Sequence, residues 1–229
     1  MRVAEMFYSI QGEGKLSGIP SAFVRVSGCN LRCVWCDTPY ASWDAEGEEI
    51  SVSEIVGRLS DWPTRYAVIT GGEPMIMPQI APLCDALKSN GFHVTIETAA
   101  TLFIPTRVDL ASLSPKLSNS TPNHREGGRF AAAHEEHRLN LPVVQKFIEE
   151  STDFQIKFVV CDKPDMVEIK QILGQLSGWS PSDVLLMPEG VEPAVLEARA
   201  VWLSEICQRE GFRFCPRLHI LLYGNRRGT

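Results

Sequence analysis

The sequence predicts an α/β fold in which about six parallel strands and outer helices form an incomplete, TIM-like barrel. Short runs rich in β-branched and aromatic residues alternate along the chain with longer segments of helical period. These helical segments are long enough for the crossovers that parallel strands require. Polar and glycine-containing motifs follow the ends of the strands, where α/β folds carry their functional groups.

The strands are predicted from their composition and from the turn residues that bound them. They cover residues 21–27, 66–70, 93–98, 110–116, 154–160 and 184–188. The final segment, residues 212–223, is predicted to be extended as well. These strands are too few to close an eight-stranded barrel, so the barrel is expected to be open.

Two helices are predicted in the first half of the chain. Ser51, followed by Glu54 three residues later, indicates a capping box at the start of residues 51–62. Residues 75–90 are apolar at helical spacing and end at Gly91, a typical helix terminator.

Two further helices are predicted in the second half. Pro164 begins residues 164–176, where its missing N–H costs nothing. Residues 193–210 have the clearest amphipathic pattern. The predicted buried face of this last helix consists of Val195, Ala198, Trp202 and Ile206.

Composition excludes several classes of partner. The 229 residues include 22 Lys and Arg against 28 Asp and Glu, a formal net charge of −6, whereas a nucleic-acid partner requires a basic surface. No apolar run approaches the roughly 20 residues that span a bilayer, so no membrane partner is expected. The N-terminal residues, with an acid at Glu5, lack the pattern of a signal peptide, and the expected compartment is the cytoplasm.

One domain, residues 1–229, is expected from this length. Within it, residues 117–138 are polar and rich in turn residues, which predicts a long loop that serves as a lid or an interface or is disordered. Residues 224–229 form a polar tail, and such tails are often disordered. The loop carries three histidines that are expected to be solvated: His124, His134 and His137.

Three of the seven cysteines form a C-x3-C-x2-C motif, Cys29, Cys33 and Cys36, directly after the first predicted strand. Three thiolates on a short loop can hold three irons of a [4Fe–4S] cluster and leave the fourth iron open to chemistry. Trp35 and the nearby backbone amides can donate hydrogen bonds to the cluster sulfurs and shield them from water.

Two other interpretations of the motif remain open. One is a zinc site of three cysteines and a histidine, although zinc favours paired C-x2-C motifs, and no second pair or nearby histidine follows. The other is a group of unrelated buried thiols. The remaining cysteines are predicted to be core or near-surface thiols: Cys84, Cys161, Cys207 and Cys215.

The cysteine motif resembles that of the radical S-adenosylmethionine (SAM) superfamily, and residues 70–74, Thr-Gly-Gly-Glu-Pro, resemble its GGEP motif. The resemblance implies a radical SAM core. In that superfamily SAM chelates the open iron, and one electron cleaves it into methionine and a 5′-deoxyadenosyl radical. The glycine pair makes physical sense, because a backbone without Cβ can approach the SAM amino group closely.

Residues 8–14 (YSIQGEG) and 23–38 (FVRVSGCNLRCVWCDT) are similar to the family of 7-carboxy-7-deazaguanine synthases. The similarity extends to residues 114–116, 155–158 and 217–222. It implies contraction of the ring of 6-carboxy-5,6,7,8-tetrahydropterin, with loss of ammonia, to 7-carboxy-7-deazaguanine, in queuosine-type 7-deazapurine biosynthesis. It also implies a flavodoxin or ferredoxin as electron donor and a homodimer.

The residues themselves suit a pterin. Its guanine-like edge has two adjacent donors, which a carboxylate can bind through two parallel hydrogen bonds. Glu13 is the candidate carboxylate, with Gln11 and the backbone of Ile10 and Gly12 beside it. The alternative is that this stretch forms an ordinary turn.

Arg25, on an otherwise apolar strand, is the candidate partner of the substrate carboxylate, because its planar guanidinium binds a carboxylate through two hydrogen bonds. The alternative is a structural salt bridge, since an unpaired buried arginine is costly. The resemblance further implies that Thr38 ligates Mg²⁺, for which a hydroxyl oxygen is suitable, although Thr38 can also cap the loop. It implies that Thr70 and His219 contact the substrate, with a structural role for His219 left open.

For SAM the resemblance implies a set of residues from the cysteine loop and the strand ends. They are Trp35, Cys36, Asp37, Gly72, Glu73, Glu97, Thr98, Ser114, Pro115 and Lys116. No side chain in this chemistry must act as a strong general base, so no catalytic side chain is predicted beyond the cofactors.

Two rival functions remain. A radical SAM enzyme that makes a glycyl radical on a partner protein has the same cysteine motif, but residues 11–14, Arg25 and Thr38 favour a small acidic heterocycle. The rival of another class is a non-catalytic zinc-binding module.

Overall fold

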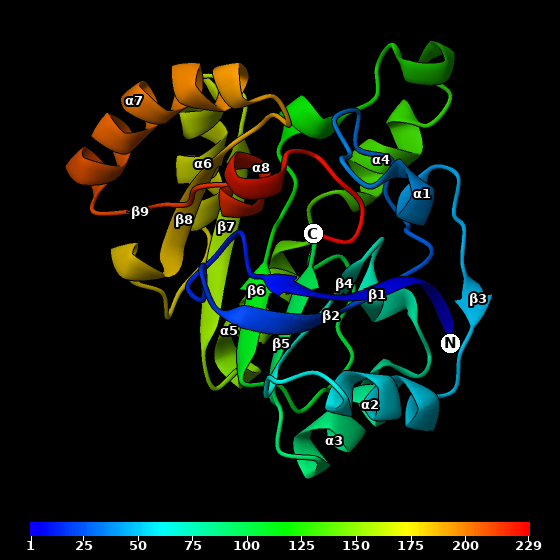
Figure 1. The fold of residues 1–229 in the computed structure, drawn as a ribbon. Coiled ribbons are helices and arrows are strands. Elements are labelled where there is room, and N and C mark those ends of the chain that lie inside the picture. Colours follow the sequence, from blue (N-terminus) through cyan, green and yellow to red (C-terminus); the bar gives the residue numbers. More distant parts are fainter.

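A single sheet of nine strands forms the centre of the molecule, and the computed structural model describes all residues from 1 to 229 (Figure 1). Across the sheet the strands follow the order β3-β1-β2-β4-β5-β6-β7-β8-β9. The strands are β1 Arg2–Ile10, β2 Pro20–Val26, β3 Glu48–Glu49, β4 Tyr66–Gly71, β5 His93–Thr98, β6 Leu110–Leu113, β7 Phe154–Val160, β8 Val184–Pro188 and β9 Arg213–Phe214.

The strands from β2 to β9 in this order are parallel to their neighbours, whereas β1 pairs antiparallel with both β2 and β3. Strands β2, β4, β5, β6, β7 and β8 are the six that the sequence predicts. Because the sheet ends at β3 on one side and β9 on the other, the barrel is incomplete, and the predicted fold class is confirmed. The sequence analysis missed β1, which forms a hairpin with β2.

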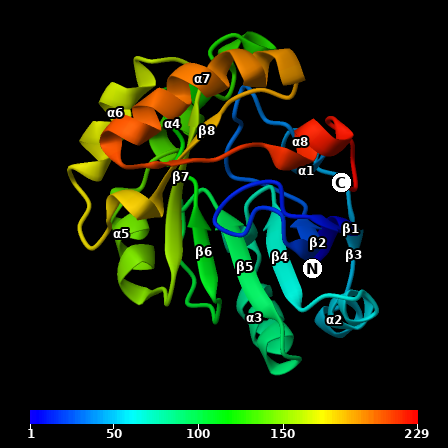
Figure 2. The ribbon, with the colours of Figure 1, turned by 60° about the vertical axis from the view of Figure 1, so that its left-hand side comes forward.

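Along the sequence, the helices and helical turns lie mainly between one parallel strand and the next. They are α1 Pro39–Ser42, α2 Val52–Ser60, η1 Pro74–Ile76, α3 Ile80–Ser89, η2 Ser118–Ser120, η3 Arg125–Gly128, α4 Ala131–His137, α5 Leu141–Glu150, α6 Asp165–Leu173, η4 Pro181–Asp183, α7 Pro193–Glu210 and α8 Leu218–Tyr223. Figure 2 shows α3, α5, α6 and α7 along the outside of the curved sheet and α8 apart from them, beside the C-terminal end of the chain. No helix combines the length and the apolar character needed to cross a membrane.

The parallel strands are buried on both faces, which explains their nearly continuous apolar sequences. All five residues of β8 are buried, as are six of the seven residues of β7. The core cluster joins these strands to side chains from α2, α3, α5 and α6. The charged exception within β7 is Lys157, which is also buried and therefore needs a partner.

The predicted start of α2 and the predicted end of α3 are confirmed. The Ser51 hydroxyl accepts the Glu54 backbone N–H at 3.2 Å at the start of α2. The Glu54 carboxylate pairs with Arg58 at 2.6 Å, so half of the predicted capping box forms. Gly91 has a φ of +77° directly after α3, as expected of a helix terminator.

Three predicted segments have different bounds in the structure, and one of them is the helix predicted over residues 164–176, which ends at Leu173. The strand predicted over residues 110–116 ends at Leu113, because Pro115 has no N–H for the ladder. The helix predicted over residues 75–90 begins at Ile80. Pro78 disfavours the helical conformation at the residue before it, and that residue is extended.

The prediction for residues 212–223 was wrong in its second half. Only Arg213–Phe214 pairs as a strand, and Leu218–Tyr223 forms the helix α8. Pro216 cannot continue the strand pairing. The apolar run that follows has no clear period, so periodicity could not distinguish the two structures.

The helix α7 has the predicted bounds, and its predicted buried face is confirmed at Ile206 and at Trp202, which packs against the core, but not in the first turns. Val195 is 40% exposed and Ala198 is exposed, contrary to the prediction. Leu196 begins the apolar stripe that packs on the sheet, and the other buried residues of α7 are Leu203, Ile206 and Cys207. Since Val195 and Leu196 are both apolar, the sequence admits two stripes one residue apart.

Residues 117–138, predicted as a loop, contain the turns η2 and η3 and the helix α4. The run of three alanines from Ala131 favours helix, a signal that the turn residues obscured. The prediction of solvated histidines was wrong for His134, which is 2% exposed, whereas His124 and His137 are exposed.

The end of β4 packs closely against the start of the cysteine loop. A Cβ on Gly72 would overlap the carbonyl oxygens of Gly28 and Ala41. The Gly72 N–H donates to Val26 at 3.1 Å, and the Glu73 N–H donates to Gly28 at 2.9 Å. A glycine is therefore required here for backbone packing, independently of any ligand.

Replacing Gly72 with Ala is expected to lower the free energy of unfolding by about 1–3 kcal/mol, because the backbone must shift to relieve the overlap. Gly57 is the matched control, since it lies in the exposed interior of α2 with no atom within 4 Å of an added Cβ. Gly57→Ala is expected to stabilise by up to about 1 kcal/mol. Chemical denaturation of both variants checks this, and equal effects would contradict the packing argument.

Candidate functional site

A cavity of about 530 Å³ lies at the carboxyl ends of the parallel strands, within the size range of small-molecule sites. It collects residues from the β1–β2 turn, the cysteine loop, the strand ends and α8. Of the predicted site residues, the following line it: Ile10, Gln11, Gly12, Glu13, Arg25, Cys29, Cys33, Trp35, Cys36, Asp37, Thr38, Thr70, Gly72, Glu97, Thr98, Ser114, Lys116 and His219. Glu73 and Pro115 do not line it.

The three motif cysteines follow β2 and face this cavity together. All are free thiols, and burial raises the pKa of Cys29 and Cys33 to about 12. No three His, Cys, Asp or Glu side chains lie close enough to bind one metal ion, which disfavours a preformed zinc site. A [4Fe–4S] cube binds each thiolate to a different iron, so it accepts thiols that are further apart. The cysteine loop therefore fits the cluster better than it fits zinc.

The backbone of the cysteine loop is held by side chains around it. The Trp43 indole N–H donates to the Cys33 carbonyl at 3.0 Å. The Arg32 guanidinium donates to the Cys29 carbonyl at 2.7 Å. The Ser42 hydroxyl lies 3.1 Å from the Cys36 sulfur. These contacts fix the path of the cysteine-loop backbone through the protein's own side chains.

Trp35 differs from its prediction in one respect. Its indole N–H donates to Asn119, to the backbone oxygen at 3.1 Å and the side-chain oxygen at 3.2 Å. The ring packs against a small apolar cluster that includes Val159 and Met187. Trp35 therefore shields the cavity wall but does not supply a hydrogen-bond donor to cluster sulfurs.

Four charged side chains form the centre of an ion-pair network across the mouth of the barrel, and Glu97 adds a longer contact to Lys157 at 4.0 Å. The Glu13 carboxylate binds Lys157, and its other oxygen lies 3.1 Å from Nε of Arg217. Arg217 also binds Asp37 and donates to the Gly190 carbonyl at 2.6 Å. The network thus connects β7, the β1–β2 turn, the cysteine loop and the segment before α8.

This network keeps its carboxylates ionised. Burial on its own raises the pKa of Glu13, but the charges of Lys157 and Arg217 outweigh burial and hold that pKa well below its usual range. Burial likewise raises the pKa of Asp37, and Arg217 brings it below the usual value. Both carboxylates are therefore available as hydrogen-bond acceptors at neutral pH.

Lys157 and Arg217 were missed as site residues, although each lies in a segment that resembles the family. Each is 6% exposed. A signal was present for Lys157, because a cation inside an apolar strand is costly without a charged partner. No comparable signal marked Arg217, which follows Pro216 in an irregular segment.

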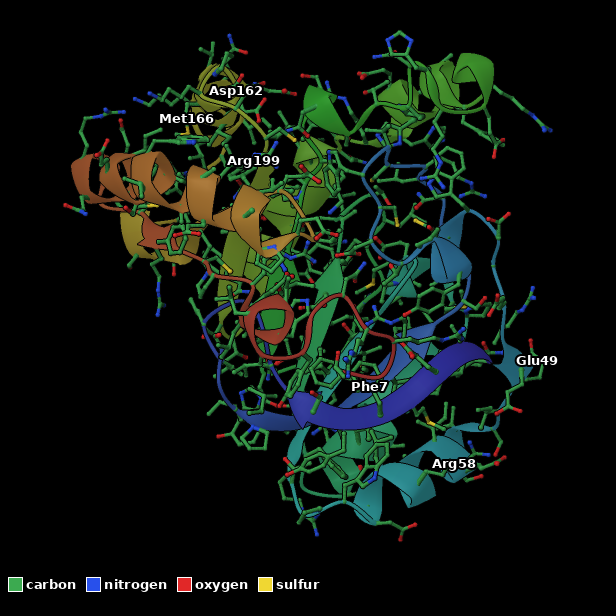
Figure 3. All side chains as sticks on the ribbon, turned by 45° about the horizontal axis from the view of Figure 1, so that its top comes forward. Phe7, Glu49, Arg58, Asp162, Met166 and Arg199 are labelled. Atoms are coloured by element: carbon green, nitrogen blue, oxygen red, sulfur yellow. The ribbon has the colours of Figure 1, made fainter.

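Arg25 combines the two interpretations that the sequence left open. Its Nε donates to Glu5 at 2.7 Å, and its guanidinium lies 5.6 Å from the centre of the Phe7 ring. Figure 3 shows Phe7 on β1. The Phe7 ring stacks on the Phe23 ring, with the two ring centres 4.7 Å apart. The two terminal nitrogens of Arg25 have no hydrogen-bond partner in the protein. The salt bridge therefore orients a fork that remains free on the cavity side.

The β1–β2 turn is ordered by its own contacts. The Gln11 side chain is buried and donates to the Ser21 hydroxyl at 3.0 Å. The Gly12 carbonyl accepts the Leu218 N–H at 2.9 Å, which ties the turn to α8. A Cβ on Gly12 would overlap the His219 ring, so this glycine lets the histidine pack against the turn. Burial lowers the pKa of His219 and favours its neutral form.

Two predicted carboxylates differ in their surroundings. Glu73 is fully buried and accepts the Met75 and Ala99 backbone N–H groups and the Thr98 hydroxyl. Its side chain therefore joins β4 to β5 and has no contact with the cavity. Glu97 lines the cavity and accepts the Thr70 hydroxyl at 2.7 Å.

Thr38 has no capping hydrogen bond from its side chain, and its hydroxyl lies 3.8 Å from the Cys36 sulfur. The Thr38 oxygen therefore makes no helix-capping hydrogen bond.

Lys116 is also held at the cavity wall. Its ammonium donates to Ser114 at 2.8 Å and lies 5.9 Å from the centre of the Trp35 ring.

The tail at residues 224–229 reaches the cavity wall. Arg227 pairs with Glu46 at 3.0 Å and with Glu5 at 3.5 Å, and its guanidinium lies 4.2 Å from the centre of the Tyr40 ring. Glu5 is thus shared by two arginines, Arg25 and Arg227.

A histidine outside the predicted site contacts the cysteine loop. His134 on α4 accepts the Arg32 backbone N–H at its Nδ1 atom at 3.1 Å. Its Nε2 atom lies 2.9 Å from the Ser120 hydroxyl. Burial lowers the pKa of His134 to about 4, so the ring is neutral at physiological pH.

Comparison with known proteins relates this site to a family. Residues 23–115 match the Radical SAM superfamily. A 7-carboxy-7-deazaguanine synthase from Rhodopirellula baltica is 43% identical over 227 residues, which cover 99% of this chain and 88% of the relative. One from Halobacterium salinarum is 39% identical over 233 residues, which cover 97% of this chain and 90% of the relative.

Solved structures agree. The crystal structure of QueE from Escherichia coli matches with a TM-score of 0.70 and 27% identity, over 93% of this chain and 92% of the other. SuiB from Streptococcus suis, bound to its precursor peptide SuiA, matches with a TM-score of 0.55 and 13% identity. That match covers 84% of this chain and 47% of SuiB, and it shows a shared fold alone.

Replacing Arg217 with Met is expected to lower the free energy of unfolding by about 3–5 kcal/mol, because Glu13 and Asp37 lose a buried partner. Arg107→Met is the matched control. Arg107 pairs with Asp85 at 3.8 Å between side chains that are 69% and 55% exposed, and its loss should cost less than about 1 kcal/mol. Urea denaturation compares the two, and similar losses would contradict the importance of the buried network.

Proposed function

The chain belongs to the family of 7-carboxy-7-deazaguanine synthases, and from this membership we propose that it contracts the ring of 6-carboxy-5,6,7,8-tetrahydropterin to 7-carboxy-7-deazaguanine with loss of ammonia. Membership makes the chain a radical SAM enzyme that acts on a small molecule. The observation that carries the proposal is that one cavity combines the three-cysteine loop with an ionised carboxylate and an arginine fork.

Cys29, Cys33 and Cys36 hold the [4Fe–4S] cluster, which with bound SAM supplies the radical that removes hydrogen from the substrate. Thiols must lose their protons when they bind iron, and the raised pKa values of Cys29 and Cys33 in the metal-free chain make cluster loading dependent on pH. SAM contacts come from the cysteine loop and the strand ends, including Gly72, Glu97 and Ser114.

Glu13 binds the guanine-like edge of the pterin. Its oxygens already accept hydrogen bonds from Lys157 and Arg217, and each oxygen has a further lone pair. The two cations keep the carboxylate ionised, so it accepts two donors without being protonated. Ile10, Gln11 and Gly12 line the cavity beside it, and an analogue without these donors would leave Glu13 poorly satisfied.

Arg25 binds the substrate carboxylate through its two terminal nitrogens. Glu5 holds Nε and thereby orients the guanidinium toward the cavity. Thr38 would hold Mg²⁺ through its hydroxyl oxygen, and such a hard cation would supply positive charge beside the substrate carboxylate. Thr70 and His219 complete the wall around the substrate. The residues thus position the substrate and exclude water, and none acts as a strong base.

The proposal extends to the electron donor, the assembly and the compartment, for which the resemblance to the family is the support. A reduced flavodoxin or ferredoxin supplies the electron, and the chain forms a homodimer, the commonest assembly of soluble enzymes. The enzyme works in the reducing cytoplasm, in agreement with its seven free cysteines.

The decisive experiment is anaerobic turnover of the reconstituted enzyme with 6-carboxytetrahydropterin, SAM, Mg²⁺ and a reductant, with the deazaguanine product followed by mass spectrometry. Product formation is expected for the wild type and none for Cys33→Ala. A colourless protein that binds zinc and no iron would contradict the cofactor proposal. An iron–sulfur protein that cleaves SAM but leaves the pterin unchanged would contradict the substrate proposal.

Replacing Arg25 with Ala is expected to raise KM for the pterin about 10- to 100-fold, because one charge-assisted pair is lost. Uncoupled SAM cleavage should persist, since the one hydrogen-bonded ion pair of Arg25 is with Glu5 and not with the cysteine loop. The control is Arg65→Ala, because Arg65 lies at the opposite end of the sheet, where β4 begins. Steady-state kinetics check this, and an unchanged KM in Arg25→Ala would refute the assignment.

A further inference from the structure

The segment from η2 to α4 contacts the cysteine loop at three successive places. The Arg32 N–H donates to His134 at 3.1 Å, and the Val34 N–H donates to the Ser120 carbonyl at 2.8 Å. The Trp35 indole N–H donates to Asn119 at 3.1 Å. These donors lie on both sides of Cys33, so the loop that carries it is bound along its length.

His134 is the one side chain of this segment that binds a backbone amide between Cys29 and Cys33. Its tautomer is fixed by its surroundings. Nδ1 accepts the Arg32 N–H, so Nε2 carries the proton and donates to the Ser120 hydroxyl. That hydroxyl in turn donates to the Leu117 carbonyl at 2.6 Å. The ring therefore has one arrangement in which both of its nitrogens are satisfied.

We infer that His134 is a positioning residue for the iron–sulfur cluster. His134 holds the Arg32 N–H away from the thiols and fixes the backbone path between Cys29 and Cys33. It acts through the peptide group and contacts no cluster ligand. The inference rests on the proposed cluster site but not on the identity of the substrate.

The hydrogen-bond partner of the Arg32 N–H affects the reduction potential of the cluster. Backbone N–H groups near a cluster donate to its sulfurs, and the number of such hydrogen bonds helps to set the reduction potential. In the structure the Leu31 N–H lies 3.3 Å from the Cys29 sulfur, whereas the next N–H, that of Arg32, is bound by His134. Without this acceptor, the Arg32 N–H is free to turn toward a sulfur, which raises the potential.

Two amide variants separate this role from simple packing. In His134→Asn the side-chain oxygen takes the place of Nδ1 and can still accept the Arg32 N–H. In His134→Gln the polar group extends to the place of Nε2, so the acceptor at Nδ1 is lost. Both variants bury an amide on the same helix, so general destabilisation affects them alike. His137→Gln on the exposed face of α4 is the control, because His137 contacts only the Ala133 carbonyl of its own helix.

The first measurement uses the metal-free chain and needs no activity. Hydrogen exchange of residues 32–34 is expected to be about 3- to 10-fold faster in His134→Gln than in the wild type, from the loss of one hydrogen bond. His134→Asn and His137→Gln should exchange like the wild type. Equal exchange in the Asn and Gln variants would overturn the inference.

The second measurement uses the reconstituted holoenzyme. Redox titration followed by electron paramagnetic resonance should give a higher reduction potential for His134→Gln, with that of His134→Asn close to the wild type. A potential that is unchanged in His134→Gln would overturn the inference. If the wild type binds no cluster, the proposed cofactor fails, and with it the positioning role, whereas cluster binding without pterin turnover rejects only the substrate.

Discussion

Ion pairs centred on two buried cations, Lys157 and Arg217, hold the mouth of the open barrel together. Lys157 on β7 binds Glu13 from the β1–β2 turn, and Arg217 joins Glu13 to Asp37 of the cysteine loop. A closed barrel would connect these regions by strand pairing, but here β1 and β8 belong to opposite halves of an open sheet. Buried ions are costly unless each has a partner, and each ion of this network has at least one. Ion pairs thus hold together the regions of the site that strand pairing would connect in a closed barrel.

The ion pairs that hold the site together also orient the side chains proposed to bind the substrate. Glu13 is an acceptor of pterin donors in our proposal, and it remains ionised because two cations contact it. On the other side of the cavity, Glu5 orients the Arg25 fork through one nitrogen and leaves two free. Both charged residues proposed to bind substrate, Glu13 and Arg25, are therefore held by a neighbour of opposite charge. Such preorganisation reduces the entropy that binding must otherwise cost.

The limits of prediction from sequence follow from the range of the interactions. Buried parallel strands have local signals, so β2, β4, β5, β6, β7 and β8 were all found. The site residues with motif spacing, such as Cys29 and Gly72, were also placed at the cavity. Arg217 and His134 have no local signal, because their partners lie far away in the sequence. Likewise Glu73, in a recognised motif, uses its side chain to join two strands, a fact that only the fold reveals.

The position of Arg217 has a consequence for the order in which the protein matures. Its partners are residues 13 and 37, which leave the ribosome long before it does. By contrast, the cysteine loop is braced by Trp43, Asn119, Ser120 and His134, all of which are synthesised earlier. The binding loop for iron can thus be shaped while the mouth of the barrel still lacks its last arginine. Docking of the C-terminal segment, which brings Arg217 and His219 to the cavity, then follows as a late step.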